Sequence, residues 1–246
     1  MPSSRSWPAA LILVRNGESA GKVARDDAEA EGDHYIDIDE RDMDVDLSPL
    51  GERQAAALGR WLGGQGDEAP TIAVSSPYVR ARRTAALAVE AAGLDLELLL
   101  DERLREREFG VLDGLTLRGI AHHHPEQAAA RRRLDKFYHR PPGGESWCDV
   151  GLRVRSFLDS VSREHAGERV LVVAHQVVIH MFRYVLEHLT EQEILAESRA
   201  HELANCSVTT YVHDPDLGRN GGMALRRFYE PVPMEASGVE VTTEPD

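Results

Sequence analysis

Short, almost uninterrupted apolar segments alternate with longer helix-like segments along this chain of 246 residues. The clearest apolar segments span residues 10–15 and 169–174. Strands without polar alternation are typical of a parallel sheet that is covered by helices on both faces. The alternation therefore predicts an α/β fold, a single-domain three-layer α/β/α sandwich with a mostly parallel central sheet. In such sheets ligands bind beyond the carboxyl ends of the strands, so functional side chains are expected there.

Turn and capping residues define the other expected elements. Further strands are expected at residues 71–75, 96–100, 206–213 and 223–229. Helices are expected at residues 49–63 after Ser48 and Pro49, and at 77–93, 116–138, 146–165 and 176–189. Residues 16–47 are interpreted as a long acidic loop.

The domain organisation follows from these elements. Residues 1–230 form one domain, with a helical insertion at about residues 115–145. Residues 231–246 lack apolar periodicity and are predicted to be a flexible C-terminal tail that adds little to the core.

Composition limits the partners of the chain. Its hydrophobic content of 42% suffices for a buried core, and its formal net charge of −14 disfavours nucleic acid or an acidic membrane surface as a partner. The apolar run at residues 9–14 is too short to span a membrane, and the two cysteines fit no disulfide framework and no metal site. We therefore expect a cytoplasmic monomer or homodimer with no cofactor and no metal, which binds anions through a local cluster.

Residues suited to phosphate chemistry stand where three expected strands end. These three segments are Leu13-Val14-Arg15-Asn16-Gly17-Glu18-Ser19, Ser75-Ser76-Pro77-Tyr78-Val79-Arg80 and Val173-Ala174-His175-Gln176. A fourth segment, Leu104-Arg105-Glu106-Arg107-Glu108-Phe109-Gly110, lies between the second and the third. This ordered set resembles the histidine phosphatase superfamily, which includes the cofactor-dependent phosphoglycerate mutases. The resemblance extends from about residue 11 to residue 212, and it includes Gly143-Gly144-Glu145-Ser146 and Asn205-Cys206-Ser207.

The resemblance assigns roles to four of these residues. Arg15 and Arg80 match phosphate-clamping arginines, and His175 matches a second histidine of the site. Guanidinium groups bind phosphate oxygens bidentately, and an imidazolium would add positive charge. Glu106 matches the acid that protonates the leaving oxygen, a role that needs a raised pKa. Each residue taken alone could be a solvated charge, and Glu102 and Glu108 are neighbouring alternatives to Glu106.

Four further residues are weaker candidates for the same site. Ser19 and Lys22 are predicted to contact phosphate, although Lys22 stands where the family often has asparagine. Arg107 and Gln176 are predicted to contact substrate.

Asn16 occupies the position at which the family has its nucleophilic histidine. The nitrogen lone pair of an amide is delocalised, so asparagine offers neither useful basicity nor nucleophilicity. Two explanations remain open: a deliberate substitution in the protein sample, or a natural pseudoenzyme. The sequence therefore predicts a phosphomonoester hydrolase scaffold that acts on a small phosphorylated metabolite, or binds inorganic phosphate, and is impaired by Asn16. The alternatives are a non-catalytic phosphate-binding protein and a phosphoglycerate mutase.

Two other motifs are interpreted as non-catalytic. His122-His123-His124 suggests a metal tract, but adjacent helical residues point to different faces, which favours a solvated helix surface. The acidic residues 33–46 lack the central glycine and the terminal glutamate of a calcium loop. They are predicted to form a flexible rim over the site.

Overall fold

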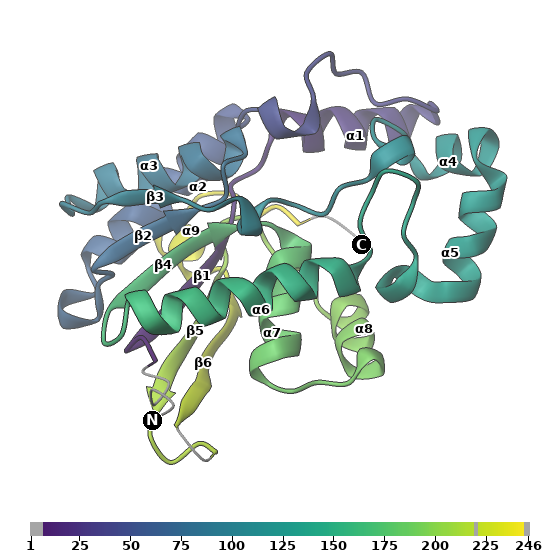
Figure 1. The fold of residues 1–246 in the computed structure, drawn as a ribbon. Helices are drawn as coiled ribbons and strands as arrows, with labels where there is room; N and C mark the ends of the chain where they lie inside the picture. Colours follow the sequence, from purple (N-terminus) through teal and green to yellow (C-terminus); the bar gives the residue numbers. More distant parts are fainter. Residues whose placement is uncertain (1–6, 219–220, 244–246) are drawn as a thin grey trace.

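The computed structural model describes residues 7–218 and 221–243, and within this part of the chain it contains one six-stranded sheet (Figure 1). The spatial order is β3-β2-β4-β1-β5-β6. The strands are β1 Ala10–Arg15, β2 Ile72–Ser75, β3 Leu98–Leu100, β4 Arg169–Ala174, β5 Val208–Asp214 and β6 Gly222–Glu230. Strands β1 to β4 are mutually parallel, whereas β5 runs antiparallel to β1 and β6. The predicted mostly parallel sheet is confirmed.

Helices cover both faces of this sheet, as predicted (Figure 1). The helices are α1 Ala20–Glu31, α2 Pro49–Gly63, α3 Val79–Ala92, α4 Leu117–His123, α5 Pro125–Tyr138, α6 Trp147–Glu164, α7 Gln176–Leu186, α8 Glu191–Ala200 and α9 Val232–Ser237. Leu11 and Leu13 of β1 pack with α6 and α7, while Ile12 and Val14 pack with α2 and α3. This two-sided burial explains why the strand carries no polar residue before Arg15.

None of the helices within the described ranges is both long and apolar enough to cross a membrane. Cys148 and Cys206 are free thiols, consistent with the absence of a disulfide framework in the sequence.

The start of α2 fixes the loop that follows β1. The Ser48 hydroxyl accepts a hydrogen bond from the Gly51 amide at 3.0 Å and donates one to the Glu18 carboxylate at 2.6 Å. A Cβ atom on Gly51 would lie 2.0 Å from the Glu18 carbonyl oxygen, so only glycine permits this approach. The loop after β1 is therefore held tightly against α2.

Two helices that precede the C-terminal segment were missed from the sequence. Residues 20–31, interpreted as part of a loop, form α1, which begins at the Ser19 cap and ends at Gly32 with φ 77°. Only Lys22 and Ala28 of this helix are buried, so it shows little apolar periodicity. Helix α8 begins with a capping box at Thr190 that the sequence analysis overlooked.

The C-terminal segment contributes to the core, contrary to the expectation from its composition. Met234 in α9 is fully buried among residues of α2 and α3. Further on, the Thr242 hydroxyl accepts from the Gln54 side-chain amide at 2.9 Å and donates to the Asn205 side chain at 3.0 Å. The composition suggested a loose tail, because the residues that make these contacts are far apart in the sequence and leave no local pattern.

Candidate functional site

The carboxyl ends of β1, β2 and β4 lie side by side in the sheet. Arg15 is paired in register with Ala174, and Ser75 with Val173. The Asn16 amide continues this ladder by donating to the Ala174 carbonyl at 2.9 Å. Asn16 and His175 therefore occupy adjacent strand ends.

His175 is the most enclosed residue of this group. Its side chain is 1% exposed, and its Nε2 atom lies 2.9 Å from the Ser76 hydroxyl oxygen. Burial, together with the positive charges of Arg80, Arg15 and Arg153, lowers the His175 pKa well below its ordinary value. The same burial and positive charges disfavour the imidazolium form. A bound dianion would raise the pKa by offsetting the neighbouring positive charges.

Both predicted clamp arginines are buried at the same edge of the sheet. Arg15 donates to the Leu203 carbonyl, and Arg80 carries its guanidinium 5.1 Å from the centre of the Tyr78 ring. Both charges lower the His175 pKa, so the two arginines and the histidine interact electrostatically. Buried guanidinium groups are suited to an anion that can neutralise them.

Asp42 occupies the guanidinium fork of Arg80. Its Oδ1 and Oδ2 atoms lie 2.9 Å from Arg80 Nη1 and 3.0 Å from Arg80 Nη2, respectively. The Asp42 carbonyl also accepts from Nη1 at 2.5 Å. A phosphate oxygen would use the same donors with the same bidentate geometry. The sequence offered no signal for this contact because Asp42 is one of six similar aspartates in residues 33–46.

Asp42→Asn is expected to strengthen the binding of inorganic phosphate about three- to tenfold, because a neutral amide competes less well for Arg80 and does not repel the anion. Isothermal titration calorimetry checks this. Asp44→Asn is the matched control, since Asp44 lies in the same turn but pairs with the exposed Arg41. Equal or weaker affinity in Asp42→Asn would show that the carboxylate does not compete with phosphate.

Glu106 has the raised pKa that a proton donor needs. Burial raises the pKa of Glu106. The Arg107 amide donates to its carboxylate at 2.8 Å, and this hydrogen bond and the Arg80 charge both lower the pKa, but they do not cancel the effect of burial. The nearby Asp42 charge raises the pKa further. Glu102 and Glu108 are exposed, and Glu108 accepts a hydrogen bond from the Tyr78 hydroxyl at 2.8 Å. Among the three candidate acids, the electrostatics favour Glu106.

An ion-pair network holds the loop that carries Glu106. The Glu145 carboxylate pairs with Arg105 and with Arg153, each at 2.8 Å. Arg153 also donates to the carbonyls of Arg103 and Arg105 at 2.7 and 3.0 Å. Glu145 and Arg153 are therefore positioning residues that the sequence analysis did not identify, although it noted the motif containing Glu145.

Asn16 is held by bonds to its backbone and its side chain. Its carbonyl accepts from the Asn205 side-chain amide at 2.9 Å, and its own Nδ2 donates to the Gly17 carbonyl at 2.8 Å. The Gly17 amide donates to Thr84 Oγ1 at 3.0 Å, and that hydroxyl donates to the Arg80 carbonyl at 2.6 Å. These bonds link the loop after β1 to the helix that carries Arg80.

The remaining predicted residues have structural partners. The Ser19 hydroxyl caps α1, and the Lys22 ammonium pairs with Asp26 on the same helix. The Arg107 guanidinium lies 4.3 Å from the centre of the Phe109 ring, and Gln176 is the buried first residue of α7. The charges of Arg15 and Arg80 thus act on His175, and the charge of Arg80 acts on Glu106. Ser19 and Lys22 are instead engaged by the cap and the first turn of α1.

Comparisons with known proteins identify the family of this chain. A model of the histidine phosphatase superfamily (branch 1) matches residues 11–222. A 2,3-bisphosphoglycerate-dependent phosphoglycerate mutase of Rhizobium meliloti is 38% identical over 189 residues, which cover 75% of this chain and 82% of the relative. A bifunctional protein of Mycobacterium tuberculosis is 40% identical over 186 residues, which cover 73% of this chain and 46% of the relative. A solved mycobacterial glucosyl-3-phosphoglycerate phosphatase complexed with VO3 has a TM-score of 0.67 and 26% identity, and the match covers 90% of this chain and 99% of that chain.

Proposed function

Because the chain belongs to the histidine phosphatase superfamily, branch 1, we propose that it binds the phosphoryl group of a small phosphorylated metabolite between Arg15, Arg80 and His175. The observation that carries this proposal is the convergence of two buried guanidinium groups on a buried histidine at one edge of the sheet. Asp42 pairs with Arg80 in this structure, and a phosphate group that displaced it would supply both negative charge and acceptor oxygens to the two arginines.

The reaction proposed for this scaffold is hydrolysis of a phosphate monoester. Arg15 and Arg80 would hold the non-bridging oxygens as charge accumulates on them, and His175 would donate a hydrogen bond once the anion has raised its pKa. Glu106 would deliver its proton to the leaving oxygen, for which its raised pKa is suited. The products are an alcohol and inorganic phosphate.

Asn16 determines how far this chemistry proceeds. The family resemblance implies a histidine at this position that accepts the phosphoryl group. The side-chain amide of asparagine cannot form that intermediate. Hydrolysis by this chain would then depend on direct attack by water, at a rate lower by several powers of ten.

Two alternatives have specific support. Asn16 favours a non-catalytic protein that binds a phosphorylated ligand. The 38% identity to a phosphoglycerate mutase favours transfer to a second substrate. We prefer the phosphatase, since a solved structure whose match covers 90% of this chain is named as a phosphatase.

Arg80→Ala is expected to weaken vanadate and inorganic phosphate binding about ten- to a hundredfold, because a charge-assisted bond to a buried anion contributes about 1.5–3 kcal/mol. Isothermal titration calorimetry of the otherwise unchanged chain measures this effect. The matched control is Arg82→Ala, since Arg82 lies on the same helix but is exposed. Unchanged affinity in Arg80→Ala would remove this arginine from the site and contradict the proposal.

A further inference from the structure

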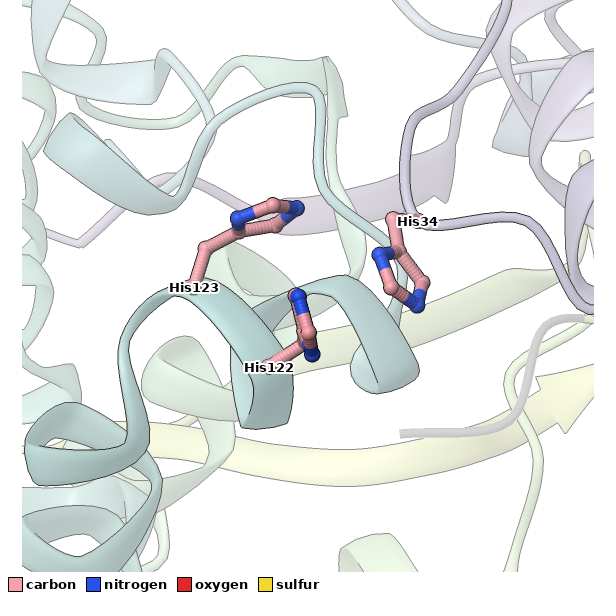
Figure 2. Close-up of side chains that lie close together, drawn as sticks. All are labelled: His34, His122 and His123. Carbon is pink, nitrogen blue, oxygen red and sulfur yellow. The ribbon is translucent and has the colours of Figure 1, made fainter.

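Three histidines from two distant segments meet outside the site described above. His122 and His123 end α4, and His34 lies in the connection that follows α1 (Figure 2). The His34 ring centre lies 4.6 Å from that of His122 and 5.2 Å from that of His123, and the latter two are 4.7 Å apart. The sequence suggested a solvated helix surface because neighbouring helical residues diverge, and no local pattern placed His34 beside them.

The backbones that carry these histidines are joined to each other. The Thr116 amide donates to the His34 carbonyl at 3.2 Å, and the Thr116 hydroxyl donates to the Asp33 carbonyl at 2.6 Å. The Ile36 amide donates to the Gly114 carbonyl at 2.9 Å. A Cβ atom on Gly119 would lie 1.9 Å from the His34 carbonyl oxygen, so glycine permits this close approach. The three imidazoles are therefore presented by a fixed backbone frame and not by independent loops.

We propose that His34, His122 and His123 bind one divalent transition-metal ion of the Zn²⁺ type. One ring nitrogen from each histidine lies within 4.8 Å of the others. Tetrahedral coordination with metal–nitrogen distances of about 2.0–2.1 Å requires ligand nitrogens about 3.4 Å apart. Rotation of the imidazole rings would have to bring the three nitrogens from their present separation to this distance. His34 is partly exposed and the other two are exposed, so the rings have room to rotate and the ion can enter from solvent.

A metal ion binds the unprotonated imidazole, which offers a ring-nitrogen lone pair to the ion. Three protein ligands leave a fourth position for water. The bound ion would cross-link the connection after α1 to α4.

Zinc titration of a chain without a polyhistidine tag tests this proposal. We expect one Zn²⁺ per chain and a melting temperature raised by roughly 5 °C or more at about a hundredfold excess over the dissociation constant. Co²⁺ should give the visible absorption of a low-symmetry nitrogen-ligated site. His34→Ala, His122→Ala and His123→Ala should each weaken Zn²⁺ binding at least about tenfold, because loss of a direct ligand costs at least as much as loss of an outer partner.

His124→Ala is the matched control, because His124 belongs to the same tract but has its Nδ1 atom 3.6 Å from the Glu126 carboxylate. This variant should bind Zn²⁺ like the unaltered chain. Melting curves recorded without metal show whether each variant still folds. His34→Gln replaces the imidazole with a side chain of similar size, so weaker Zn²⁺ binding by a folded His34→Gln protein reports loss of a ligand and not misfolding. The proposal is overturned if His34→Ala and His34→Gln both fold and bind Zn²⁺ normally, or if His124→Ala loses binding as the other variants do. Either outcome would indicate adventitious binding to the tract.

Discussion

Asn16→His is expected to raise the rate of aryl phosphate hydrolysis by at least about a thousandfold, since loss of a covalent nucleophile costs hydrolases several powers of ten. Imidazole supplies the lone pair that the amide lacks. The surrounding groups need not change, because the loop after β1 is fixed by Asn205 and Thr84, and Arg80 and His175 are already in place. Steady-state kinetics with p-nitrophenyl phosphate, with a chelator present, measure the gain.

Controls distinguish a restored nucleophile from a general change in the site. Asn16→Ala and Asn16→Gln remove or lengthen the amide without adding a nucleophile, so neither should gain activity. Arg80→Ala in the Asn16→His background should lose most of the gained rate. An Asn16→His protein that binds vanadate but hydrolyses no phosphate ester would contradict the phosphatase and favour the non-catalytic binding protein.

Glu106→Gln, made in the Asn16→His background, is expected to slow hydrolysis of an alkyl phosphate by about 10²–10⁴, the usual contribution of a general acid. The loss should be much smaller with p-nitrophenyl phosphate, because its leaving group needs little protonation. Glu108→Gln is the matched control, since Glu108 is nearby but exposed and bonded to Tyr78.

The pH dependence provides an independent check on Glu106. A general acid acts in its protonated form, so activity is present below its pKa and falls as the pH rises through it. Because burial raises the Glu106 pKa, this fall should occur at higher pH than for an ordinary carboxyl group. Glu106→Gln should abolish that limb of the profile. If the limb persists, or if Glu108→Gln removes it instead, Glu106 is not the acid.

The sequence by itself determined the framework of the protein. Strands β1 and β4 and the capped start of α2 lie where they were predicted, because continuous burial and helix capping leave local signals. Two of the candidate site residues could also be located from the sequence, because Arg15 and His175 directly end or follow predicted strands. Helix α1 was missed for the converse reason, since its mostly exposed face carries almost no apolar pattern.

Only the tertiary structure decided the contacts and charges of the site. Asp42 meets Arg80, and Ser76 meets His175, across long stretches of chain that no local pattern relates. The lowered pKa of His175 follows from its burial among positive charges, and burial depends on the whole fold. His34 joins His122 only because backbone hydrogen bonds attach its segment to α4. Local sequence encodes which segments become strands and helices, whereas pKa values and ligand sets arise from distances between residues that only folding brings together.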